Sequence, residues 1–122
     1  MFRLKIHTSF AAAHCLIHYQ GDCENLHGHN FKVQVVLAGE RLDDTGMLVD
    51  FIDVKNLMGQ VLARLDHQNL NEVSPFDVKN PSAENIARYL YFELGRKLNN
   101  ENITVDVVTV WESDFAGASY YE

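Results

Sequence analysis

Residues 27–37 read His-Gly-His-Asn-Phe-Lys-Val-Gln-Val-Val-Leu, and apolar side chains occupy every second position from Phe31 to Leu37. Successive side chains of a β-strand point to opposite faces of its sheet, so this alternation is typical of a strand with one buried face. The same period of two runs through residues 2–6 and 103–112, and a short strand is expected after Gly117. The sequence therefore predicts two strands near each end of the chain.

Two helices are expected between these pairs of strands. Over residues 50–65 the apolar side chains recur at steps of three and four, which places them on one face of a helix. A second helix is expected to begin at Ser82, a good capping residue, and to run towards Asn100. The order β-β-α-α-β-β predicts a single α+β domain over residues 1–122, with an antiparallel four-stranded sheet and both helices on one face.

The face of the sheet away from the helices is expected to carry apolar side chains. A four-stranded sheet also has open edges, which favour pairing with other chains. Joining the sheets of several subunits into a closed barrel removes both liabilities, so we expect a symmetric oligomer. The apolar side chains assigned to this face are Val36, Ala38, Val108 and Val110.

Charge and composition exclude several classes of protein. The formal net charge is −7 with only 10 Lys and Arg, which argues against a nucleic-acid surface, because phosphate backbones are bound by clustered basic residues. No apolar run approaches the roughly 20 residues that cross a bilayer, and the first residues do not resemble a signal peptide. We therefore expect no membrane partner and a cytoplasmic location. In such reducing surroundings Cys15 and Cys23 are expected to be free thiols.

Three histidines stand where neighbouring strands can bring them together. His27 and His29 flank Gly28 and, on a strand, project from one face with Cα atoms about 6.6 Å apart. His14, at the end of the first strand, can supply a third nitrogen. Three neutral nitrogen ligands are typical of catalytic zinc, because one tetrahedral position stays open for water or substrate. Such a pair can also be two polar side chains on a solvent-facing strand, but the third histidine and the nearby thiol favour the metal.

The thiol of Cys23 lies four residues before His27. It either closes the metal site as a fourth ligand or acts as a base or nucleophile beside an open site. A nearby Zn²⁺ favours the thiolate, and we favour the base. Cys15 follows His14 and points to the opposite face of the strand, so it is expected in the core.

Two other positions carry acidic side chains that suit chemistry. Asp66 and His67 stand side by side at the end of the first helix, where the carboxylate can orient the imidazole for proton transfer. The alternative is an ordinary polar helix C-terminus. Glu112 ends a strand after Trp111, and its carboxylate can accept two hydrogen bonds from the guanidine-like edge of a heterocycle. A solvated strand end is the alternative there.

In this order, the motifs resemble the 6-pyruvoyltetrahydropterin synthase and 6-carboxytetrahydropterin synthase family over nearly the whole chain. The short chain and the Cys-x₃-His-x-His spacing look more like the bacterial 6-carboxytetrahydropterin branch, which feeds queuosine and related deazapurines. The matching segments are residues 10–14, 23–29, 49–51, 65–67, 70–71, 80–85 and 111–112.

The resemblance implies the tunnelling fold (T-fold), in which the sheets of a trimer close into a barrel. Two trimers then stack as a homohexamer with active sites at subunit boundaries. The implied substrate is 7,8-dihydroneopterin triphosphate, converted to 6-carboxy-5,6,7,8-tetrahydropterin with release of acetaldehyde and triphosphate. The family also implies a Zn²⁺ centre formed by His14, His27 and His29, with Cys23 as the base. Asp66 and His67 are implied to form a proton relay. Glu112 is implied to anchor the pterin and is also a candidate member of the relay.

Glu24 departs from the family pattern. Many relatives have a small or basic residue after the cysteine, and another branch uses a glutamate near here in place of the thiol. Glu24 is therefore a second candidate to share or modify the role of the base. Two other functions stay open: a 6-pyruvoyltetrahydropterin synthase, which releases triphosphate but no acetaldehyde, and a non-catalytic zinc-stabilised assembly protein in which Cys23 closes the site.

Overall fold

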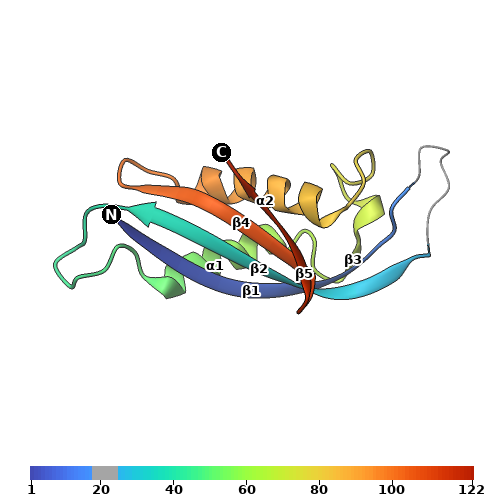
Figure 1. Cartoon of the computed structure of the whole chain (residues 1–122), viewed down its shortest axis with the longest axis horizontal. Helices are drawn as coiled ribbons and strands as arrows, with labels where there is room; N and C mark the ends of the chain where they lie inside the picture. Colours follow the sequence, from blue (N-terminus) through green and yellow to red (C-terminus); the bar gives the residue numbers. More distant parts are fainter. Residues whose placement is uncertain (18–24) are drawn as a thin grey trace.

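The strands lie in one sheet, and both α-helices cover the same face of it (Figure 1). The computed structural model describes residues 1–17 and 25–122. Within these residues the sheet has five strands in the order β3-β1-β2-β4-β5. The elements follow one another along the chain as β1 (Phe2–His14), β2 (His27–Gly39), α1 (Phe51–Leu62), β3 (Gln68–Asn69), the 3₁₀ helix η1 (Leu70–Glu72), α2 (Ala83–Leu98), β4 (Ile103–Ser113) and β5 (Ala116–Tyr121).

The predicted α+β class and the order of the long elements are confirmed. The four long strands pair in antiparallel fashion. The sheet nevertheless has a fifth strand that was not expected, the two-residue β3, which pairs in parallel with β1 at Ala12 and Ala13. The last strand begins at Ala116, slightly earlier than predicted.

Both helices begin at the residues that their capping side chains predict. The carboxylate of Asp50 accepts a hydrogen bond from the backbone N–H of Ile52 at 2.8 Å. The hydroxyl of Ser82 likewise accepts from the backbone N–H of Asn85 at 3.1 Å, so each cap satisfies one of the unpaired amides of a helix N-terminus. The core lies between the helices and the sheet, where alternate residues of β2 from Phe31 to Leu37 are fully buried.

A β-bulge in β4 changes which of its side chains face the helices. Val36 of β2 pairs with Val107 and the next residue, Leu37, pairs with Val105, so Asp106 is an extra residue in β4. After one extra residue, every later side chain of the strand points to the opposite face of the sheet from the one that simple alternation predicts. Val108 and Val110 are therefore buried in the core, and their expected place on the uncovered face is wrong. That face carries many polar side chains, among them Lys5, His7, Lys32, Gln34 and Thr109.

Cys15 is buried, as its position next to His14 predicts; its side chain is only 4% exposed. It is disulfide-bonded, so the expectation of a free thiol at this position is wrong. Cys23 and Glu24, the two candidates for the base, lie outside the described residues. In the part of the chain that the structure describes, no helix combines the length and the apolar content needed to cross a membrane.

Candidate functional site

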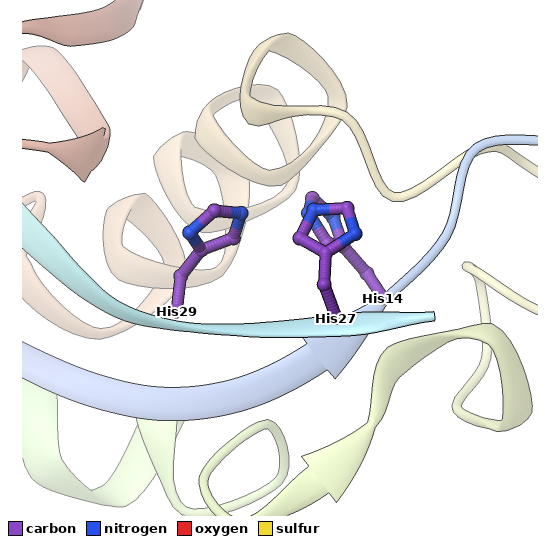
Figure 2. Close-up of side chains that lie close together, drawn as sticks. All are labelled: His14, His27 and His29. Carbon is purple, nitrogen blue, oxygen red and sulfur yellow. The ribbon is translucent and has the colours of Figure 1, made fainter. Parts of the chain in front are cut away.

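Three imidazoles from β1 and β2 face one another at one end of the sheet, and we call them the imidazole cluster: His14, His27 and His29 (Figure 2). One nitrogen from each ring lies within 4.8 Å of the other two. The Nε2 atoms of His14 and His27 are 3.1 Å apart. Strand pairing produces this convergence, because His14 lies directly opposite His27 and His29 projects from the same face of β2. The cluster can hold a metal ion.

Backbone carbonyl groups fix the orientation of two of these rings. The Nδ1 atom of His14 lies 2.7 Å from the carbonyl oxygen of Pro81, and that of His27 lies 2.8 Å from the carbonyl oxygen of Asn25. A carbonyl oxygen only accepts hydrogen bonds, so we assign the proton of each neutral ring to Nδ1. Each Nε2 atom then directs a lone pair into the cluster. Metal-binding histidines commonly have such a carbonyl or carboxylate partner on the second nitrogen.

His29 supplies an independent sign that the cluster suits a metal ion. Its Nε2 atom is buried and has no hydrogen-bond partner among the described residues, an arrangement that costs free energy unless a ligand satisfies the atom. Burial lowers the pKa of His29, and the neighbouring His14 and His27 lower it further, against an opposing effect of Glu112. The ring therefore favours the neutral form that binds metals. Three neutral imidazoles suit zinc, copper, iron and nickel ions alike.

The lowered pKa of His29 predicts a pH dependence of stability for the metal-free protein. In the unfolded chain His29 takes up a proton near its ordinary pKa of about 6.5. Below that pH the unfolded state therefore binds more protons than the folded state, so the free energy of unfolding falls as the pH falls. Thermal melts between pH 7.5 and 5.5 measure this slope.

The matched variants for this measurement are His29→Asn and His7→Asn. Asn carries no titratable group, so His29→Asn is expected to lose stability less steeply than the wild type as the pH falls. His7 is exposed on β1 outside the cluster, so its replacement controls for the loss of one strand histidine away from the site. Equal slopes for wild type and His29→Asn would contradict the assignment.

Glu112 lies beside the imidazole cluster. Its carboxylate oxygens are 3.8 Å from Nε2 of His14 and 4.0 Å from Nε2 of His29. The bulge at Asp106 brings Glu112 to the helix-covered face, and Glu112 is itself an extra residue between the pairs that β4 forms with β5. Bulges commonly re-aim side chains next to active sites. The side chain is 34% exposed, so it remains accessible to a ligand.

Asp66 and His67 form a second polar group at the edge of the sheet, beside β1. The Oδ1 atom of Asp66 accepts a hydrogen bond from the backbone N–H of Ala11 at 2.9 Å and lies 3.0 Å from Nδ1 of His67. The Ala11 N–H and then His67 lower the pKa of Asp66, so it is ionised at neutral pH. The carboxylate thus joins the imidazole of His67 to the backbone of β1.

His67 is held in an unusual backbone conformation. Its φ angle is +59°, in the left-handed region that costs free energy for residues other than glycine. Its backbone N–H donates to the carbonyl oxygen of Ala11 at 2.6 Å, which holds this conformation against the strand. The side chain is 81% exposed. His67 is therefore fixed at its backbone while its ring remains available to a ligand or another chain.

The imidazole cluster and the Asp66–His67 pair are separate within the described part of one chain. No hydrogen bond or ion pair joins them there, although His29 and His67 both line a groove of about 510 Å³. Small residues form much of the groove wall, including Ala11, Ala13 and Gly28. The convergence of His14, His27 and His29 follows the sequence prediction, and the roles of Asp66, His67 and Glu112 stay predictions. Sequence reasoning missed the carbonyl of Pro81. Its only signal was segment 80–85, which matched the family pattern without a role.

Comparisons with known proteins identify the family and the fold. Residues 3–122 match the family model described as 6-pyruvoyl tetrahydropterin synthase. A putative 6-carboxy-5,6,7,8-tetrahydropterin synthase of Archaeoglobus fulgidus is 40% identical over 101 residues, 82% of this chain and 83% of the relative. The dihydroneopterin monophosphate aldolase of Pyrococcus furiosus is 32% identical over 115 residues, covering 94% and 93%. The solved 6-pyruvoyl tetrahydropterin synthase of Caenorhabditis elegans superposes with a TM-score of 0.87 at 30% identity, covering 99% and 95%.

Proposed function

Because the chain belongs to the 6-pyruvoyl tetrahydropterin synthase family and has its tunnelling fold, we propose that it is a zinc-dependent 6-carboxytetrahydropterin synthase. It converts 7,8-dihydroneopterin triphosphate and one water to 6-carboxy-5,6,7,8-tetrahydropterin, acetaldehyde and triphosphate, in the cytoplasm, for queuosine and related deazapurines. The observation that carries the proposal is the imidazole cluster with its unsatisfied His29 nitrogen. The 40% identity to a putative 6-carboxytetrahydropterin synthase supports the choice of product.

The metal would be held by His14, His27 and His29, whose neutral nitrogens point into the cluster. Bound zinc acts as a Lewis acid that makes the hydroxyl-bearing carbons of the substrate side chain more acidic. Proton removal from such a carbon requires a base, and we assign this role to Cys23 in its reduced, thiol form. A thiolate suits this role because positive charge nearby lowers the pKa of a thiol.

We assign the binding of the pterin ring to Glu112. A carboxylate has two oxygens that accept parallel hydrogen bonds, which matches the two N–H groups of the guanidine-like edge of a pterin. The position of Glu112 beside His14 and His29 would place the pterin side chain next to the metal ligands. Contact with Glu112 therefore orients the bond that is to be broken.

Asp66 and His67 are assigned to proton transfer. The ionised carboxylate of Asp66 holds the Nδ1–H of His67 and leaves Nε2 exposed to accept or donate a proton. Among the described residues of one chain, no hydrogen bond or ion pair joins this pair to the imidazole cluster. We therefore propose a homohexamer, a dimer of trimers, in which Asp66 and His67 of one subunit serve the cluster of a neighbour. The long edge of β5, which pairs only with β4 among the described residues, supports this assembly.

A second activity is favoured by the similarity to the monophosphate aldolase and by Glu24, which follows Cys23 directly. A carboxylate is also a competent general base. With Glu24 as the base, the protein would cleave a carbon–carbon bond of a dihydroneopterin phosphate and leave a pterin with a shortened side chain. A 6-pyruvoyl product is the third outcome, by analogy with the Caenorhabditis elegans protein.

Product analysis tests the proposal and separates these activities. Zinc-loaded protein is incubated with dihydroneopterin triphosphate or monophosphate. A phosphine reductant is included because the proposed base, Cys23, acts only as a thiol and Cys15 is disulfide-bonded. We expect 6-carboxytetrahydropterin in the mass spectrum, with acetaldehyde and triphosphate in equal amounts. Triphosphate without acetaldehyde would indicate the pyruvoyl product. A pterin with a shortened side chain, with neither acetaldehyde nor free triphosphate, would indicate the aldolase. Metal-depleted protein is the control, and the absence of any pterin product would overturn the enzymatic assignment.

A further inference from the structure

Side chains from the segment that follows α1 form hydrogen bonds with the backbone along the open edge of β1 and just beyond its end. Asp66 accepts from the backbone N–H of Ala11. Beyond β3, the amide of Asn71 accepts from the N–H of Cys15 and donates to its carbonyl, both at 2.9 Å. The amide of Asn80 does the same to Ile17, at 2.7 Å and 2.8 Å. A primary amide offers one donor and one acceptor side by side, like a peptide group, so each Asn replaces a partner strand.

Asn80 differs from Asn71 because the residue that follows it in the chain contacts the imidazole cluster. The next residue is Pro81, whose carbonyl oxygen receives the Nδ1–H of His14. Asn85, in the first turn of α2, donates to the carbonyl oxygen of Asn80 at 2.9 Å. The dipeptide of Asn80 and Pro81 therefore contacts the backbone of Ile17, three residues beyond the end of β1, and the ring of His14, the last residue of β1. It is also tied to α2.

We propose that Asn80 is a positioning residue for the metal ligand His14. The Asn80 amide fixes the backbone of Ile17, three residues beyond the end of β1, relative to the carbonyl of Pro81, and that carbonyl sets the rotation and tautomer of the imidazole. Without the amide, the two hydrogen bonds to Ile17 are lost and the carbonyl is free to shift relative to β1. This inference rests on the proposed function only in treating the imidazole cluster as a metal site.

A purely structural role of Asn80 can be separated from positioning by a matched residue. Asn102 uses its side-chain amide in the same way, accepting from the N–H of Arg41 at 3.0 Å and donating to its carbonyl at 2.9 Å. This contact lies beyond the end of β2 that is opposite to His27. Asn102→Ala therefore removes an equivalent pair of hydrogen bonds, together with a longer one from the N–H of Glu40 at 3.3 Å, far from the imidazole cluster.

The test compares wild type, Asn80→Ala, Asn80→Asp and Asn102→Ala, with zinc alone or cobalt(II) alone and no pterin. We expect Asn80→Ala to bind zinc about tenfold more weakly or worse in chelator competition, as for other second partners of ligating histidines, and to change the visible absorption of bound cobalt. Asn102→Ala is expected to lose comparable thermal stability but to keep wild-type zinc affinity and cobalt spectrum.

Asn80→Asp covers the case in which the Ala variant does not fold. It keeps the acceptor for the N–H of Ile17 but sets a carboxylate oxygen against the Ile17 carbonyl, so we expect weakened zinc binding here too. Wild-type affinity and spectrum in the folded Asn80 variants would overturn the proposal. Because no pterin is present, a failure of this test is distinct from a failure to find the proposed product.

Discussion

Replacing His27 with Ala is expected to leave the folded protein without a bound metal ion and to lower turnover by at least about a thousandfold. Loss of the hydrogen-bond partner of a metal ligand typically lowers metal affinity or activity 10–100-fold, and loss of the ligand itself is expected to lower them further. Two imidazoles would remain, one nitrogen short of the three that a catalytic zinc site usually takes from the protein. The His27 ring is exposed, so the change should cost little stability.

The measurement is metal content per chain after dialysis, together with turnover and a thermal melt. His7→Ala is the matched control, because His7 is also an exposed strand histidine and pairs with Gln34 away from the cluster. It is expected to retain metal and activity. A full complement of metal in His27→Ala, or unchanged turnover, would remove His27 from the site.

The histidine convergence is accessible from sequence because it depends only on strand periodicity. His27 and His29 share a face as soon as residues 27–37 are identified as a strand, and His14 follows if the neighbouring strand is antiparallel. The structure brings these three rings together. The two helices and their starts at Asp50 and Ser82 are equally local, since a capping side chain and a repeat of apolar residues lie within one segment.

The sheet face on which Glu112 lies could not be predicted from the sequence in the same way. Two extra residues in β4, at Asp106 and at Glu112 itself, decide where the side chain points. Neither bulge leaves a Gly or Pro signal in the sequence, and simple alternation wrongly placed Val108 and Val110 on the uncovered face. A strand of two residues such as β3 is also too short to show a period.

The contacts around β1 depend on segments far apart in the chain. Asn71 and Asn80 each contact a residue more than 50 positions earlier, and no local pattern identifies the partner. The same holds for the hydrogen bond between Asp66 and Ala11. The disulfide of Cys15 contradicts an expectation that rests on the compartment, which concerns the surroundings of a protein and not the geometry of its cysteines.

Replacing Asp66 with Asn is expected to lower kcat by about 10²–10⁴-fold, the usual contribution of a positioned acid–base group, while metal content stays at the wild-type value. The amide is isosteric and can still accept from the Ala11 N–H, so the fold should be kept. It carries no charge, so it no longer stabilises a protonated His67, although its oxygen still faces Nδ1 of that ring. Steady-state kinetics with metal analysis measures this. Unchanged kcat, or loss of metal, would contradict the relay.

Co-expression of Asp66→Asn with His27→Ala tests whether the relay and the metal ligands come from different subunits. Each variant alone lacks one half of every site. In randomly mixed hexamers with composite sites, about a quarter of the sites would combine an intact cluster with an intact relay from a neighbour, and turnover should recover to about a quarter of the wild-type value. If both halves belonged to the same chain, no site in the mixture would be complete and activity would stay at the level of the single variants. Differently tagged chains, purified in two steps, ensure that only mixed assemblies are assayed. A monomer in sedimentation at micromolar concentration would rule out the composite site before any kinetics.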